Sequence, residues 1–267
     1  MPISVDKSVL EELYAKYNRR EFIHPDPLEF LYDYPDLRDR EIVGLVASSL
    51  AYGRVSQILK SVSSVLSRMP YPARYLRRAS VESLRGAFAD FKHRFTTGED
   101  LCFMLAGIKH VIERYGSLST CFVMGLNEDH DTVIPALTAF VNELTAAGGR
   151  QNYLLPSPAD GSACKRLNLF VRWMVRRDEV DPGGWEAVPT SKLIVPLDTH
   201  MHTICLALDI TERKQADLRT AAEITAAFRT ISPEDPVRYD FALTRLGIRK
   251  DAKIDSFLER CAIRKAA

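Results

Sequence analysis

The chain has 267 residues, 46% of them hydrophobic, which is enough to form a substantial core and excludes extensive disorder. Its 36 basic and 35 acidic residues leave a formal net charge of +1, so no excess of Lys and Arg marks it as a nucleic-acid-binding protein. The five cysteines occur singly, which excludes a CxxC metal motif and a disulfide framework and indicates a reducing compartment.

The N-terminal segment 1–20 carries no apolar run fit for a signal peptide, and no membrane-length run follows it, so we expect a cytoplasmic protein without membrane association. Apolar residues recur there with the spacing of an amphipathic helix over 5–20. The next helix begins near Asp36 with acidic residues and ends at Gly53. The same periodicity predicts helices over 54–68, 99–115, 131–147, 161–177, 199–209, 218–229 and 236–246.

Only residues 192–195 have the composition of a strand, and four residues make no sheet, so the pattern predicts an all-α fold. Loops rich in Gly, Pro and Ser are expected at 69–75, 148–162 and 178–192. The last two loops flank the predicted helix 161–177.

The segment 161–177, GSACKRLNLFVRWMVRR, contains basic residues and no acidic residue. Small residues at its start would leave helix N–H groups free to bind a phosphate: Gly161, Ser162 and Ala163. Arg166 and Arg172 would then assist on a DNA backbone. A solvated basic face that complements the helix dipole explains the same charges.

The stretch 194–202, IVPLDTHMH, places Asp198 at the start of the next predicted helix. An aspartate there acts as a helix N-cap without any further function. On an extended segment Asp198 would share one face with His200 and His202, and this set could hold the zinc of a metal-dependent hydrolase. The predicted helix does not favour that arrangement.

A third interpretation pairs Asp198 with Lys165 in cleavage of an N-glycosidic bond. A lysine amine can attack the anomeric carbon of the sugar and form a Schiff base. A carboxylate can stabilise the oxocarbenium-like charge and transfer protons.

The segment VPLDTHMHTICLALDI (195–210) resembles the V-D-T-H segment of the helix-hairpin-helix DNA glycosylases, the superfamily of endonuclease III and 8-oxoguanine glycosylase. Upstream, GSACKRLN (161–168) resembles the hairpin of that family. The resemblance places Lys165 on the catalytic lysine and Asp198 on the catalytic aspartate. EIVGLVASSLAYGRVSQILKSV (41–62) resembles the early helix pair, with Ala51 and Tyr52 near the position that probes DNA. The whole chain resembles a bacterial group of unknown function related to these glycosylases.

The hairpin departs from the family pattern, because Ala163 replaces its second glycine and Asp160 stands where its proline would be. The insertion 178–192 also lengthens the gap between Lys165 and Asp198. A modified hairpin and a wide gap are features of the archaeal 8-oxoguanine glycosylase branch. The four-cysteine cluster of endonuclease III is missing, so the resemblance implies no iron–sulfur cluster, no metal and no other cofactor.

The resemblance implies a two-lobed helix-hairpin-helix fold, with a central lobe at 36–177 and a second lobe formed by 1–35 together with 178–267. The implied function is DNA base-excision repair, the removal of a damaged base such as an oxidised purine from double-stranded DNA, with AP lyase activity. No protein partner is expected. The alternative is a DNA-binding module that keeps the fold and has lost turnover.

Further candidate residues lie outside the central pair. Tyr52 and Arg54 either enter a DNA groove or simply close a helix end at Gly53. Trp185 either stacks on a flipped base or covers the surface as a plug. His93 either contacts the substrate or packs within an aromatic segment, and His200 is a further candidate for the base pocket.

Overall fold

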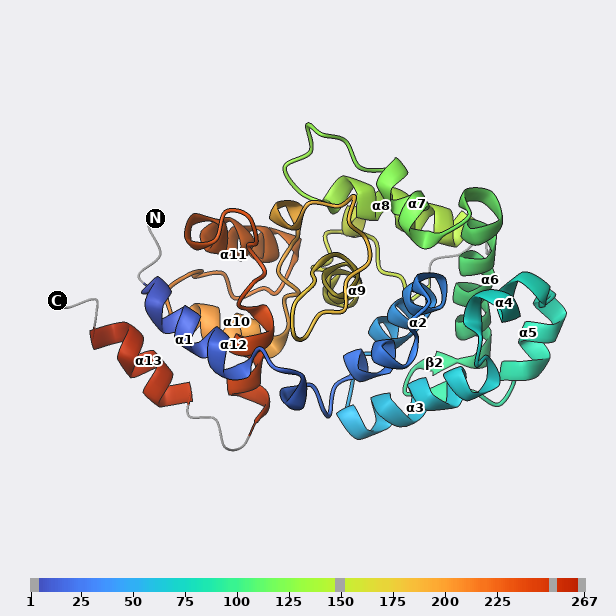
Figure 1. Cartoon of the computed structure of the whole chain (residues 1–267), viewed down its shortest axis with the longest axis horizontal. Helices are drawn as coiled ribbons and strands as arrows, with labels where there is room; N and C mark the ends of the chain where they lie inside the picture. Colours follow the sequence, from blue (N-terminus) through green and yellow to red (C-terminus); the bar gives the residue numbers. More distant parts are fainter. Residues whose placement is uncertain (1–4, 147–151, 250–253, 264–267) are drawn as a thin grey trace.

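The computed structural model describes residues 5–146, 152–249 and 254–263, and helices dominate it, as the sequence predicts (Figure 1). The α-helices are α1 (Lys7–Tyr17), α2 (Leu37–Ser49), α3 (Val55–Arg68), α4 (Pro72–Arg78), α5 (Val81–Phe88), α6 (Gly98–Tyr115), α7 (Leu118–Met124), α8 (Ile134–Ala146), α9 (Lys165–Val175), α10 (Thr199–Ala207), α11 (Leu218–Ile231), α12 (Asp240–Ile248) and α13 (Ile254–Ile263). None of these described helices combines the length and apolar character needed to span a bilayer.

Short elements connect the helices. The 3-10 helices are η1 (Arg20–Phe22), η2 (Pro27–Asp33), η3 (Pro158–Asp160) and η4 (Thr190–Lys192). A single antiparallel hairpin is described, formed by β1 (Lys92–His93) and β2 (Thr96–Thr97), in which His93 pairs with Thr96. Residues 192–195, the predicted strand, instead form the last residue of η4 and extended chain that leads toward α10.

All the predicted helices are present, and α3 matches its expected range to within one residue. The helix predicted over 161–177 begins only at Lys165, because the preceding turn contains left-handed residues at Gly161 (φ 75°) and Cys164 (φ 46°). The prediction omits α4, α5, α7 and α13, and the loop predicted at 69–75 is wrong from Pro72 onward, where α4 begins. The start of the loop predicted at 148–162 lies outside the described residues.

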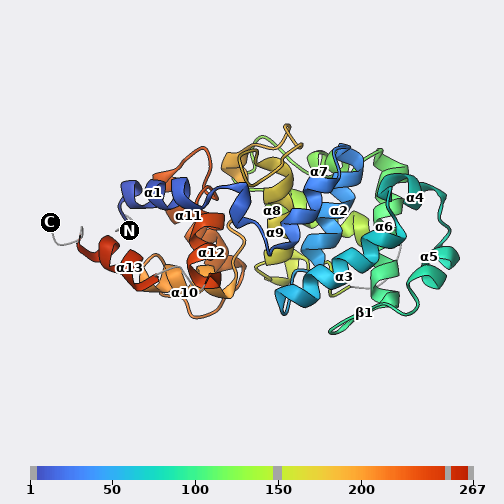
Figure 2. The same cartoon turned by 60° about the horizontal axis from the view of Figure 1, so that its bottom comes forward.

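The helices from the two ends of the sequence gather at one end of the molecule, and α4 and α5 lie at the other (Figures 1 and 2). Helix α12 packs against both α1 and α10, whereas α6 packs against α4, α5, α7 and α8. Helix α9 lies between these groups and packs against α2. The short helix η2 packs against α2 and α3. The division into a lobe 36–177 and a lobe 1–35 with 178–267 stays a prediction.

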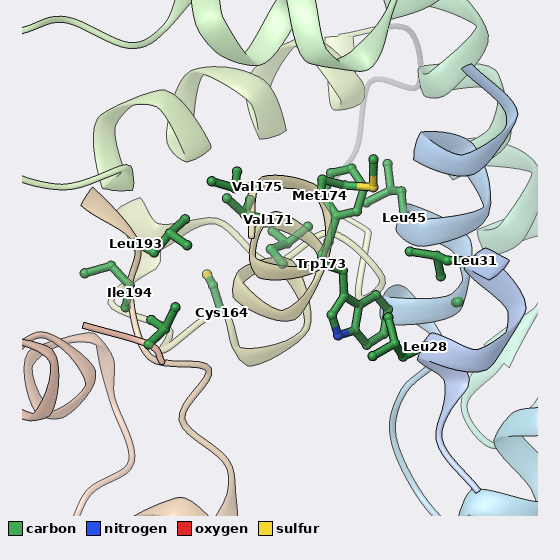
Figure 3. Close-up of a cluster of buried hydrophobic side chains, with 14 of the residues drawn as sticks. Leu28, Leu31, Leu45, Cys164, Val171, Trp173, Met174, Val175, Leu193 and Ile194 are labelled. Atoms are coloured by element: carbon green, nitrogen blue, oxygen red, sulfur yellow. The ribbon is translucent and has the colours of Figure 1, made fainter. Parts of the chain in front are cut away.

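The core around α9 explains why this basic segment is helical. Its apolar side chains face α2 and η2 on one side and the extended segment at Leu193 and Ile194 on the other (Figure 3). Trp173 is 1% exposed, and its indole lies beside Leu28 (Figure 3). Burial of a large aromatic side chain contributes roughly 2–3 kcal/mol, so this packing fixes the direction of α9.

Trp185 belongs to the core, and the prediction that it lies at the surface or against a base is wrong. It is 1% exposed, and its ring packs among Phe122, Phe140 and Phe170. Its indole N–H donates to Glu41 at 3.3 Å. Glu41 also accepts from the first backbone N–H groups of α7, and the pKa of this carboxyl is raised by burial against those hydrogen bonds. A buried acceptor thus anchors the Pro–Gly loop.

Helix α6 is tightly enclosed, and Gly107 allows its approach to α8. A Cβ atom added at Gly107 would lie 1.9 Å from the carbonyl oxygen of Leu144, so backbone must move to admit it. We expect Gly107→Ala to lower the free energy of unfolding by about 1–3 kcal/mol. Denaturant unfolding followed by circular dichroism measures this change.

Gly86 on α5 provides the matched control, because a Cβ there meets nothing within 4 Å. Gly86→Ala should stabilise the protein by up to about 1 kcal/mol through helix propensity. Equal effects of the two substitutions would contradict the close approach of α6 and α8.

Candidate functional site

Lys165 and Asp198 line the walls of the same two cavities. Lys165 is the first residue of α9 and is partly buried. Asp198 is the N-cap of α10, and its Oδ1 accepts from the backbone N–H of Met201 at 2.7 Å. The cap fixes the carboxylate beside the cavities, so structural and chemical roles for Asp198 are compatible.

The smaller cavity has a volume of about 290 Å³ and lies among α3, α9, α10 and α12. Its walls combine aromatic and apolar side chains, including Trp173 and Phe241, with polar groups that include Asp240 and Arg245. His200 lines it too, exposed at the rim against Gly247. A small cavity whose walls combine apolar surface with several convergent polar groups can hold a ligand that presents both kinds of surface.

The larger cavity, about 930 Å³, is more open and is lined by the turn before α9. Gly161, Ser162 and Ala163 all contribute to it, but they do not open the helix as predicted. The backbone N–H of Leu218 donates to the Gly161 carbonyl at 3.0 Å, and Ser162 Oγ accepts from Cys164 N at 3.2 Å. These hydrogen bonds hold the turn in a defined conformation along the wall of the larger cavity.

Arg166 is a structural residue, and the prediction that it contacts DNA phosphate is wrong. It is only 9% exposed and donates to the carbonyl oxygens of Ser49 and Tyr153. Its guanidinium carbon lies 5.1 Å from the ring centre of Tyr52 and 4.6 Å from that of Tyr153. These contacts tie α9 to the end of α2.

Arg172 is also buried, 3% exposed, so it has no surface to offer a DNA backbone and that prediction is wrong. It pairs with Asp181 at 3.1 Å and with Asp240 of α12. The C-cap of α9 repeats the pattern, because Arg176 pairs with Asp181 and Asp235. The charges that suggested a basic face instead join α9 to the C-terminal half of the chain.

The pKa of Asp240, which lines the smaller cavity, is shifted by burial and by neighbouring charges. Burial raises the pKa of Asp240 to about 6, Arg172 opposes the increase, and the negative charge of Asp198 adds to it. Its Oδ1 atom has no hydrogen-bond partner among the described residues. The cavity wall that contains Asp198 therefore also holds a buried carboxylate oxygen, Asp240 Oδ1, that is available to accept a hydrogen bond.

His93 and Tyr52 hold the β1–β2 hairpin. His93 is not free to contact a substrate as predicted, whereas Tyr52 is partly buried and lines the larger cavity, so its contact with DNA stays a prediction. His93 is 2% exposed, and burial lowers the pKa of its ring. Because a carbonyl only accepts, His93 Nε2 donates to Tyr52 O at 3.1 Å, which leaves Nδ1 to accept from Ser61 Oγ at 2.8 Å. The Tyr52 hydroxyl donates to His93 O at 2.8 Å.

The hairpin presents two residues that the sequence interpretation did not select as a pair. Phe95 is 73% exposed, and Arg94, at φ 52°, stacks on it with its guanidinium carbon 5.3 Å from the ring centre. Arg94 also crosses Gly53, where an added Cβ would lie 2.7 Å from Arg94 Cδ. Gly53 lines both cavities, so the hairpin tip lies next to their wall. Arg54, the neighbouring candidate, is exposed at the start of α3.

Asp198, His200 and His202 do not converge as the metal interpretation requires. They lie at the start of a helix, where His202 Nε2 is engaged by the Arg213 carbonyl at 2.7 Å. Within the described parts of the chain, no group of three or more His, Cys, Asp or Glu side chains is placed to hold a metal ion.

The protein is therefore mostly helical, and a lysine that begins one helix and an aspartate that caps another line the same two cavities. The sequence profile of a family described as "Protein of unknown function (DUF2400)" matches residues 26–249, and the chain belongs to this family. Comparisons with curated proteins and with solved structures gave no match. The matched range contains Lys165 and Asp198 and leaves out α1 and α13.

The buried arginine network predicts a large stability effect. Arg172→Leu leaves Asp240 without its ion-pair partner and should lower the free energy of unfolding by about 3–5 kcal/mol. Arg54→Leu removes an exposed charge near the same cavity and should change it by less than about 0.5 kcal/mol. Thermal unfolding of both variants measures the difference; a stable Arg172→Leu protein would argue against the network.

Proposed function

We propose that this protein removes a damaged base from double-stranded DNA, with Lys165 as the nucleophile and Asp198 as the charge-stabilising carboxylate. The observation that carries the proposal is their shared position on the walls of the 290 Å³ cavity. The resemblance to helix-hairpin-helix glycosylases supports the same two residues and a glycosylase-like fold. An oxidised purine is the first lesion to test, because the modified hairpin resembles the 8-oxoguanine branch.

In this mechanism the flipped nucleotide places its base in the small cavity and its sugar between Lys165 and Asp198. The deprotonated amine of Lys165 forms a bond to C1′ as the glycosidic bond breaks, and the bonding electron pair leaves with the base. The proton released by the amine passes through Asp198 to the departing base. The C1′–O4′ bond then breaks, the nitrogen lone pair forms the C=N bond and O4′ takes a proton from water, which gives a protonated Schiff base, the intermediate required for strand cleavage.

The cap geometry suits this role for Asp198. One carboxylate oxygen is held by the Met201 N–H, so the group stays beside the cavity without a change of rotamer. The adjoining wall supplies aromatic surface from Trp173 and Phe241 to contact a planar base. Asp240 offers an acceptor at the same wall.

The chemistry is tested by borohydride trapping on duplexes that carry single lesions. Wild-type protein should give a covalent adduct, and Lys165→Ala and Lys165→Arg should give none, because the arginine keeps the charge but does not form the Schiff base. Asp198→Asn retains a capping side chain and should slow base release by about 10²–10⁴-fold. Lys60→Ala, an exposed residue of α3 outside both cavities, is the control.

Trapping that persists in Lys165→Ala would exclude this lysine as the nucleophile. Salt-dependent binding of duplexes without base release from any lesion would instead support the alternative, a DNA-binding module that has lost turnover. The buried positions of Arg166 and Arg172 favour neither outcome, since they remove both residues from direct contact with DNA.

The hairpin tip supplies the wedge that base extrusion requires. Minor-groove proteins insert apolar side chains between base steps and unstack them, and Phe95 is an exposed ring beside the cavity wall. Lys92 and Arg94 are exposed on the same hairpin and can contact phosphates on either side. The anchoring of the hairpin by Tyr52 and His93 gives the ring a rigid base.

Phe95→Ser should weaken binding to lesion-containing duplex by about tenfold, because one base-stacking contact is worth about 1–3 kcal/mol. Met124→Ser is the matched control, since Met124 is also 73% exposed and lies at the end of α7. Fluorescence anisotropy with labelled duplex measures both. Equal losses would show that Phe95 acts only as exposed apolar surface.

A further inference from the structure

A groove along α4, remote from Lys165 in the fold, has a different chemistry. It has a volume of about 360 Å³ and is lined mainly by Pro70, Tyr71, Arg74, Tyr75, Arg78 and Ala79. Tyr71 is 64% exposed. None of these residues lines either cavity of the candidate site.

The groove has an apolar floor and a cationic rim. Pro70, Ala79 and the two tyrosine rings provide the floor, and Arg74 and Arg78, one helical turn apart, provide the rim. The buried face of α4 packs against α2 and α6, which leaves its arginines outside.

The charge around the groove is strongly biased. Residues 68–85 contain five arginines and one acidic residue, Glu82, although the whole chain is nearly neutral. Within the described residues Arg74, Arg77 and Arg78 form no ion pair, whereas Arg68 pairs with Asp90. Unpaired guanidinium groups around an apolar depression are a complementary surface for carboxylates beside an apolar side chain.

We propose that this groove binds an acidic peptide segment of a partner protein, with one aromatic side chain on the tyrosine floor and flanking carboxylates on Arg74 and Arg78. Tyr and Arg are the residues that most often carry binding energy at protein interfaces. Duplex DNA satisfies the rim alone, because its base faces are stacked inside. A single strand needs a positive track over successive nucleotides, whereas the two arginines that line this groove both belong to one short helix.

The test is isothermal titration calorimetry of the full chain with a synthetic peptide that has one phenylalanine flanked by aspartates. Wild-type protein should bind it, and replacing that phenylalanine by serine should weaken binding at least about tenfold, a change of 1.4 kcal/mol. Arg74→Glu and Arg78→Glu should weaken binding of the original peptide by a similar factor. Arg77→Glu makes the same charge change at an exposed position of α4 outside the groove and should stay within about twofold.

Three outcomes overturn the proposal: no measurable binding of the peptide, equal losses in Arg77→Glu and Arg74→Glu, or indifference to the phenylalanine. Tighter binding of oligothymidine that is lost in Arg74→Glu and Arg78→Glu would assign the groove to single-stranded nucleic acid instead. The proposal does not rest on glycosylase chemistry, so Lys165→Ala should bind the peptide like wild type.

Discussion

The ion pair between Arg172 and Asp240 is the contact on which the geometry of the candidate site depends. It joins α9, which begins with Lys165, to α12, and α12 in turn packs against α10, whose cap is Asp198. Arg172 is also held by Asp181 from the following loop. A buried pair is stable only when its hydrogen-bonding geometry is satisfied, so these partners tolerate little relative movement of the two helices. The relative positions of Lys165 and Asp198 on the cavity wall are therefore fixed as well.

Because several basic residues are buried in this network, the net charge of the chain does not describe the charge of its surface. Four arginines are almost entirely buried: Arg166, Arg172, Arg176 and Arg245. The last three form ion pairs with carboxylates inside the protein. They contribute to the count of basic residues but not to the field that a DNA phosphate meets. Exposed cations near the cavities come instead from the hairpin and the start of α3, at Lys92, Arg94 and Arg54. In the proposed complex with DNA, attraction to this face would therefore depend on few charges, and shape and stacking would supply much of the affinity.

Local pattern was sufficient wherever local interactions decide the structure. Apolar periodicity located α3 closely, and the capping preference of aspartate placed Asp198 at the start of α10. It failed for side chains whose partners are distant in sequence. Trp185 was expected to be exposed because its acceptor, Glu41, precedes it by 144 positions, and Arg172 was expected to be solvated because Asp240 follows it by 68. The exposed pair at Arg94 and Phe95 was missed as a unit, because strands of two residues leave no periodic signal.

The turn before Lys165 shows which glycine of the hairpin pattern the backbone needs. Gly161 occupies the left-handed region, where glycine is favoured, and Ala163 does not, so the alanine at this position carries no conformational cost. The left-handed residue next to the lysine is Cys164, held by a hydrogen bond from its backbone N–H to Ser162 Oγ and one from its thiol to Pro156 O. A non-glycine residue in this conformation costs about 1–3 kcal/mol and persists only where its surroundings impose it. Such strain is concentrated at functional sites, and here it fixes how α9 presents its first side chain to the cavity.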